Sequence, residues 1–100
     1  KPGTRSTGEH TKMVSAVVLI EAETDKINDL AEALVEIDGI REVFSVAGRY
    51  DLVAVVRVRE NEQIADVVSG QMRHLAGVVK TETLIAFRVY SREDIEGAFS

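Results

Sequence analysis

The sequence has no cysteine, and its single proline is the second residue. Without cysteine the chain can form no disulfide, no thiolate metal site and no cysteine nucleophile. Long hydrophobic runs are also missing. The longest, from Val14 to Ile20, contains Ser15 and is far shorter than the roughly 20 residues of a membrane span. The first residues lack the apolar stretch of a secretory signal. We therefore expect a cytoplasmic protein with no membrane association.

Motifs of catalysis and of cofactor binding are absent as well. There is no GxSxG nucleophile motif and no glycine-rich phosphate loop. The two histidines, His10 and His74, have no further ligands at metal-binding spacing. His74 falls near the end of a predicted helix, where a surface role beside the helix dipole accounts for it. We expect no catalytic residue, no cofactor and no metal.

The charge pattern argues against direct binding of nucleic acid. The chain has 12 lysine and arginine residues against 17 aspartate and glutamate residues, a formal net charge of −5. A protein that grips phosphates needs a basic stripe. Here the basic residues are scattered among acidic ones, so direct contact between this chain and nucleic acid is not expected.

The pattern of apolar residues predicts one domain with alternating strands and helices. Residues 1–12 are polar and aperiodic and are interpreted as a flexible leader, followed by a single domain over residues 13–100. Runs of β-branched and apolar residues predict strands over residues 14–22, 41–47, 52–59 and 78–90. Two sets of residues at helical spacing predict helices between them: Ile27, Leu30, Leu34 and Ile37, then Ile64, Val67, Val68, Met72 and Leu75. Thr24 or Asp25 is the expected N-cap of the first helix. Ser91 and Asp94 predict a short final helix through Ile95 and Phe99.

The order β-α-β-β-α-β predicts a ferredoxin-like α+β sandwich, with both helices on one face of a four-stranded antiparallel sheet. Three strands nevertheless carry apolar residues on both sides. In the first, Val17 and Leu19 alternate with Val18 and Ile20. In the last, Val79 and Ile85 are expected to oppose Leu84. A second apolar face needs a cover, so we expect a homodimer in which two sheets pack face to face as a dimeric α+β barrel. The alternative is that the short final helix folds back over this face.

Two short segments combine polar groups that suit a small ligand. Gly48, Arg49, Tyr50 and Asp51 form a turn whose N–H groups and guanidinium suit a carboxylate, and whose aspartate suits an ammonium group. The alternative is a plain hairpin turn, since glycine and aspartate are ordinary turn residues. Thr81 and Thr83 would present two hydroxyls on one side of the last strand, or serve only as β-branched strand residues.

Three segments in order resemble the effector domain, or RAM domain, of the Lrp/AsnC (feast/famine) regulators. The segment IDGIREV (37–43) resembles that domain's i-pGV segment. AGRYDLVAVV (47–56) resembles its G-x-YDL segment, and AGVVKTET (76–83) resembles its pGV-x-x-T-x-T segment. Asp38 and Ala76 replace the two family prolines, which should alter turn stiffness more than function. The resemblance covers about residues 13–90.

The resemblance implies a ligand-binding and oligomerisation domain over residues 13–100. It implies sheet-to-sheet dimers that assemble into rings of eight or ten chains, with amino-acid effectors bound between dimers. The residues that match the family's ligand-binding positions are Gly48, Tyr50 and Asp51, and Thr81 and Thr83 match the family threonines. Arg49 occupies a position that varies within the family, so it would tune selectivity for the ligand. Full-length members carry an N-terminal helix-turn-helix, whereas only twelve polar residues precede the first predicted strand. We therefore expect a stand-alone sensor that acts through co-assembly with a DNA-binding paralogue or by buffering the effector.

Two other classes share parts of this pattern. A small dimeric α+β barrel enzyme, such as a monooxygenase or isomerase, has the same strand order but keeps a histidine or an acid in a pocket between helices and sheet. The predicted core here is aliphatic apart from the threonines and His74. An ACT-like regulatory domain also binds amino acids, but the YDL and TxT motifs favour the RAM assignment.

Overall fold

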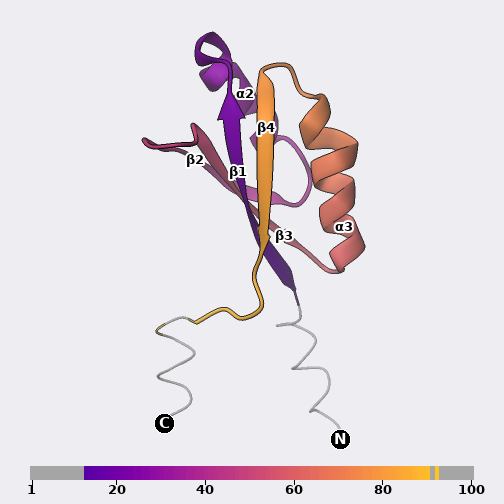
Figure 1. The fold of residues 1–100 in the computed structure, drawn as a ribbon. Coiled ribbons are helices and arrows are strands. Elements are labelled where there is room, and N and C mark those ends of the chain that lie inside the picture. Colours follow the sequence, from indigo (N-terminus) through magenta and orange to yellow (C-terminus); the bar gives the residue numbers. More distant parts are fainter. Residues whose placement is uncertain (1–12, 91, 93–100) are drawn as a thin grey trace, which may run out of the picture.

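The computed structural model describes residues 13–90 and residue 92. Four strands form one antiparallel sheet in the order β2-β3-β1-β4: β1 (Val14–Ala22), β2 (Ile40–Ser45), β3 (Leu52–Val58) and β4 (Val78–Ile85). A short 3-10 turn, η1 (Thr24–Lys26), leads into helix α2 (Ile27–Val35). The second helical segment comprises α3 (Asn61–Ala65), the π-helical η2 (Asp66–Gln71) and the 3-10 turn η3 (Met72–His74). Figure 1 shows this βαββαβ arrangement, which confirms the predicted ferredoxin-like α+β fold.

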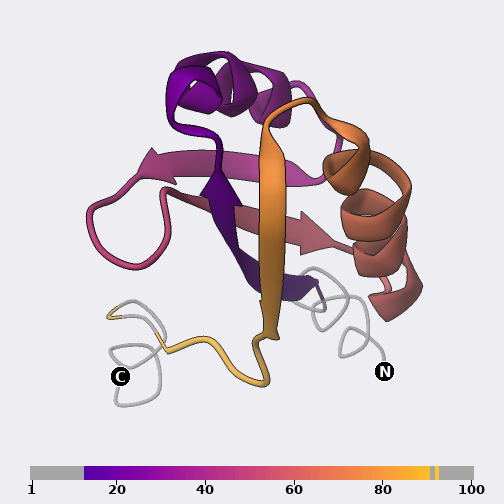
Figure 2. The same ribbon diagram turned by 45° about the horizontal axis from the view of Figure 1, so that its top comes forward.

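The core lies between the sheet and both helical segments. Ala16, Val18 and Ile20 of β1 are fully buried, and β3 buries Leu52, Ala54 and Val56 beside them. The helices contribute the remaining buried aliphatic residues of the same cluster, which are Leu30, Leu34, Ile37, Ile64, Val67, Val68 and Met72. One continuous cluster therefore joins α2 and the second helical segment to a single face of the sheet. Figure 2 shows how the two helical segments are arranged around the sheet.

The other face of the sheet is also apolar, as the sequence predicted. Cross-strand partners share a face, so Val17 and Leu19 of β1 lie beside Val55 and Val53 of β3. All four side chains are half-buried. The face continues to Phe44 in β2, the partner of Val53, and to Leu84 in β4, the partner of Val17; both are 49% exposed. We call these six residues the open face. The predicted final helix, like the predicted leader, lies outside the described residues.

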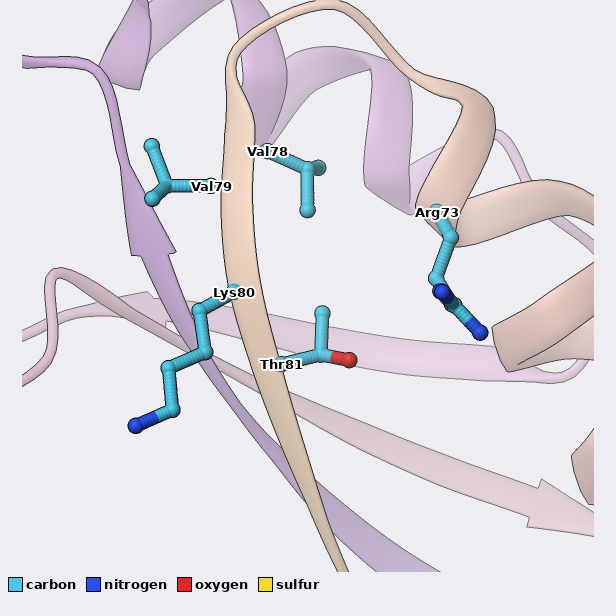
Figure 3. A pocket seen from close by; sticks show the side chains of 5 residues that line it. All are labelled: Arg73, Val78, Val79, Lys80 and Thr81. Atoms are coloured by element: carbon cyan, nitrogen blue, oxygen red, sulfur yellow. The ribbon is translucent and has the colours of Figure 1, made fainter.

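Strand β4 is shorter than predicted, and a bulge near its start changes which side chains face each side of the sheet. It ends at Ile85 instead of Tyr90: its ladder with β1 stops at the pair of Ile85 and Ala16, and one further bond runs from Ala86 N–H to the Ser15 carbonyl (2.9 Å). A bulge opposite Glu21 and Ala22 adds one residue, Val79. Val79 therefore projects to the same side as Lys80 (Figure 3), and it does not share a face with Ile85 as the alternation predicted.

Helix details differ from the sequence prediction in two places. Neither Thr24 nor Asp25 caps the first helix with its side chain, because a 3-10 turn precedes α2. The second helical segment buries the face that the sequence predicted, but over Asp66–Gln71 it is a π-helix and not an α-helix. At its start the Gln63 amide oxygen accepts hydrogen bonds from the N–H groups of Arg59 (2.9 Å) and Glu60 (2.8 Å), which fixes where α3 begins. No helix of the described part is long and apolar enough to cross a membrane.

Candidate functional site

The Gly48–Asp51 turn lies between β2 and β3, at the end of the sheet where β1 finishes. Gly48 has a φ of +137°, which only glycine adopts readily, and, its two chain neighbours aside, no other described residue has a heavy atom within 4 Å of the position a Cβ would take. The turn is closed by a bond from Val46 N–H to the Asp51 carbonyl (3.0 Å). The Asp51 N–H in turn bonds to the Ile20 carbonyl (2.9 Å), so an open backbone loop is fixed against the end of β1.

The carboxylate of Asp51 holds this loop to the central strand. Its Oδ2 accepts a hydrogen bond from Ala22 N–H at 2.8 Å, in a half-buried position. The ladder between β1 and β3 ends at Ile20 and Leu52, so the Ala22 amide has no β3 residue to bond and the side chain takes that place. Asp51 therefore has a structural bond at one oxygen, while a carboxylate keeps further acceptor capacity for a ligand.

Tyr50 connects the turn to β4. Its hydroxyl donates a hydrogen bond to Glu82 Oε1, 32 residues further along the chain. Glu82 pairs with Leu19, so it stands on the open face. This bond, together with desolvation and the Glu82 charge, raises the pKa of the Tyr50 phenol above its ordinary value, against the opposing charge of Arg49. Sequence reasoning had not selected Glu82; its place between two threonines at period two was the only available signal.

Thr81 and Thr83 face the other way. Thr81 pairs with Ile20 and Thr83 with Val18, both fully buried on the helix side, and both threonine side chains are half-buried. The structure therefore brings Glu82, and not the two threonines, to the Gly48–Asp51 turn within one chain. Among the predicted site residues, Tyr50 and Asp51 make side-chain hydrogen bonds, to Glu82 and to Ala22 N–H, that hold the turn against the sheet.

An open pocket of about 430 Å³ lies at the start of β4, lined by Arg73, Val78, Val79, Lys80 and Thr81. Figure 3 shows Arg73 of η3 and Thr81 of β4 projecting into the same space from two sides. His74, next to Arg73, is exposed. Within residues 13–90 and 92, no group of three histidine, aspartate or glutamate residues is placed to hold a metal ion.

Comparison with known proteins links this chain to a family of ligand-binding domains. The model of the Lrp/AsnC ligand binding domain matches residues 15–95. The uncharacterised HTH-type transcriptional regulator PH1916 of Pyrococcus horikoshii is 33% identical over 82 residues, which are 79% of this chain and 55% of that protein. The chain thus spans about half the length of the curated relatives it matches.

Solved structures agree with this result. The protein TTHA0845 from Thermus thermophilus superposes with a TM-score of 0.75 at 46% identity, over 79% of this chain and 99% of that one. The transcriptional regulator NMB0573 of Neisseria meningitidis, solved as a complex with L-Met, has a TM-score of 0.73 at 12% identity, over 92% of this chain and 59% of that one, and shares the fold alone. Because the family model matches residues 15–95, the chain belongs to the Lrp/AsnC ligand-binding domain family.

Proposed function

We propose that this chain is an effector-binding and oligomerisation module that takes part in transcription regulation by sensing a free amino acid. The observation that carries the proposal is the Gly48–Asp51 turn, an open backbone loop held to the sheet by the side chains of Asp51 and Tyr50. The family match supports a regulatory role, and the curated relatives are named as transcriptional regulators.

The groups of the turn suit the two charged ends of an amino acid. The N–H groups next to Gly48, with Arg49 beside them, would bind the ligand carboxylate. Asp51 would take the ammonium group through acceptor capacity that its bond to Ala22 leaves open. Ligand binding at Asp51 would then stiffen the link between the turn and the end of β1.

Thr81 and Thr83 would enter the site from another chain. Within one chain they point away from the turn, to the helix side of β4. A ligand held between two dimers can touch the turn of one protomer and the threonines of a neighbour. This arrangement accommodates all six predicted residues and makes the site dependent on assembly.

The open face is the proposed dimer interface. Its residues Val17, Leu19, Phe44, Val53, Val55 and Leu84 form a contiguous apolar surface on all four strands. A stable interface typically buries about 800 Å² on each partner, which the exposed side of a four-stranded sheet can supply. We propose that two sheets pack through this face and that the dimers form a ring of eight or ten chains. Co-assembly with a DNA-binding paralogue would supply contact with nucleic acid, for which this acidic chain has no basic stripe.

A thermal-shift screen against the twenty amino acids, L-methionine included, tests the sensing proposal. A ligand at one hundred times its dissociation constant adds about 2.7 kcal/mol to the free energy of unfolding, and so raises Tm by several degrees. Asp51→Asn removes the charge while keeping an acceptor for Ala22 N–H, and should abolish the shift. Glu62→Gln, an exposed carboxylate of α3, is the matched control and should respond like wild type. The proposal fails if no amino acid raises Tm, or if Asp51→Asn responds fully.

A further inference from the structure

A second open pocket, of about 340 Å³, lies at the end of the sheet where β1 starts and β3 finishes. It is lined by Met13, by the turn between α2 and β2 at Asp38 and Gly39, by the end of β3 and by the second helical segment. Figure 1 and Figure 2 both show this end of the molecule on the opposite side from the loop between β2 and β3. The residues that line the pocket include none of those proposed for the effector site.

Charged groups of both signs line this pocket without pairing. Asp38 and Asp66 supply two carboxylates, and Arg59 supplies a guanidinium. None of these three side chains makes a hydrogen bond or an ion pair with another described residue. Arg57 differs, because its Nε donates a hydrogen bond to Ser15 Oγ (3.3 Å). The pocket therefore has two anionic acceptors and one cationic donor whose partners are not supplied by the described part of the chain.

Gln63 adds a donor whose direction is fixed. Its amide oxygen accepts the hydrogen bonds from the N–H groups of Arg59 (2.9 Å) and Glu60 (2.8 Å). These two bonds occupy the carbonyl end of the side chain, and its NH₂ group has no partner among the described residues. Gln63 lines the same pocket as Arg59. An oriented amide donor and a guanidinium in one pocket are suited to a carboxylate.

The π-helical segment η2 brings an acid and an amide to this pocket. Asp66 and Gln71 both line it, although they are five residues apart. In an α-helix, with 3.6 residues per turn, two such residues lie about 140° apart around the axis. The wider π-helical turn, in which Met72 N–H bonds to the Val67 carbonyl, reduces that angle. Because π-helical turns are rare and occur frequently at functional sites, this distortion is a second observation that points to binding here.

The floor of the pocket is apolar and closely packed. Gly39 has a φ of +99°, and a Cβ there would lie 3.0 Å from Cγ1 of Val58 and 3.3 Å from Cγ2 of Val67. Both valines are buried and line the pocket, and Met13 extends the apolar surface. A ligand in this pocket can therefore bury a short hydrocarbon chain between its polar contacts.

We propose that this pocket binds a small zwitterion whose ammonium and carboxylate groups are separated by an apolar chain. The ammonium group binds to Asp38 and Asp66. The carboxylate binds to Arg59 and the side-chain amide of Gln63, and the chain lies on the apolar floor. A ligand with a single charge would leave the groups of the other set without a partner. The acidic and basic groups do not pair with each other, so the ligand bridges the space between them. This site shares no residue with the effector turn and goes beyond the proposed function.

Titration with γ-aminobutyrate tests the proposal, with butyrate and butylammonium as controls that each keep one of its two charges. The side-chain amide of Gln63 and the backbone amide of Gly39 are followed by heteronuclear NMR in the full chain. γ-Aminobutyrate should shift both signals in a saturable way. Each control compound should bind at least about fivefold more weakly, since it loses the charge-assisted hydrogen bonds at one end.

Two variants separate the charged ends of the site. Asp66→Asn should weaken the binding of γ-aminobutyrate by about fivefold or more and reduce its advantage over butyrate. Arg59→Gln should weaken it similarly and reduce its advantage over butylammonium. Glu32→Gln, an exposed carboxylate of α2 outside the pocket, is the matched control and should bind like wild type.

Three results would overturn the proposal. Equal affinity for γ-aminobutyrate and for either control compound would show that one of the two charges is not recognised. Unchanged affinity in both Asp66→Asn and Arg59→Gln would remove the charged groups from the site. Loss of the Gln63 response in Asp51→Asn would place the ligand at the effector turn. If the proposal holds, Asp51→Asn abolishes the amino-acid response at the turn and leaves the shift at Gln63 intact, so the two sites are tested separately.

Discussion

The phenol of Tyr50 donates a hydrogen bond to the carboxylate of Glu82, and this bond spans the sheet across β1. One residue lies in the turn before β3, and the other lies in the edge strand β4. Together with the bond from Ala22 N–H to Asp51, it ties the turn to two strands that are distant in sequence. Any ligand that engages Tyr50 therefore acts on the edge of the sheet as well as on the turn.

Tyr50→Phe should loosen the turn with little effect on the global fold, because the bond between the two side chains is exposed. We expect faster hydrogen exchange at the backbone amides of residues 46–51 and a nearly unchanged Tm. Tyr90→Phe, which removes the other tyrosine hydroxyl, is the control and should leave exchange in the turn as in wild type. Unaltered exchange in Tyr50→Phe would show that the bond does not restrain the turn.

The ionisation of Tyr50 gives a second prediction. Glu82 raises the pKa of the Tyr50 phenol, first because its carboxylate accepts the phenol's hydrogen bond and also because deprotonation would place two negative charges side by side. A group with a raised pKa in the folded state stabilises the fold at pH values below its unfolded pKa, and this contribution is lost as the pH rises through the folded pKa. In a Tyr90→Phe background, ultraviolet titration should show a phenol pKa above the ordinary value. Glu82→Gln should move it back toward that value, and an identical pKa in both proteins would refute the assignment.

Two glycines with opposite surroundings predict opposite effects on stability. Gly77 has a φ of +99°, and a Cβ there would lie 2.9 Å from Cβ of Lys26. Gly77→Ala should therefore lower the free energy of unfolding by more than about 1 kcal/mol. Gly70 lies in the helical segment with open space around it, so Gly70→Ala should raise stability by about 0.4–1 kcal/mol. Denaturant unfolding of both variants checks the signs, and destabilisation by Gly70→Ala would contradict the helical environment.

The buried face of α2 provides a further test of the core. Leu34 is fully buried, whereas its neighbour Val35 is 50% exposed. Leu34→Ala should cost about 2–5 kcal/mol of unfolding free energy, because it leaves a cavity against the sheet. Val35→Ala should cost much less. Similar losses in urea denaturation of the two variants would show that the helix does not present its predicted face to the sheet.

The fold could be predicted because each strand and helix carries apolar residues at a regular spacing along its whole length. The alternation through Ala16, Val18 and Ile20 and the spacing of Leu30 and Leu34 both report one buried face. The extent of β4 could not be read this way. Its alternation continues to Val89 in the sequence, but the ladder with β1 ends at the pair of Ile85 and Ala16. A single inserted residue, such as the bulge at Val79, likewise leaves no periodic signal.

The candidate site was only partly predictable, because some of its contacts join residues that are far apart in the sequence. Gly48, Tyr50 and Asp51 are close together in the chain, so a short motif could identify them. Glu82 reaches Tyr50 only through the strand order, which places β4 beside β1. The opposite facing of Thr81 and Glu82 also depends on register with β1, and this register divides the predicted residues between two sides of the sheet.

The mass of the protein in solution tests the central claim, that the open face joins two copies into a sensing assembly. By light scattering after size exclusion, the wild-type chain should have the mass of a dimer or of a larger even-numbered ring. Leu19→Glu, at the centre of the open face, should reduce this mass to that of one chain, and Val35→Glu, on the exposed side of α2, should not. A wild-type protein that is uniformly monomeric at micromolar concentration would contradict the account.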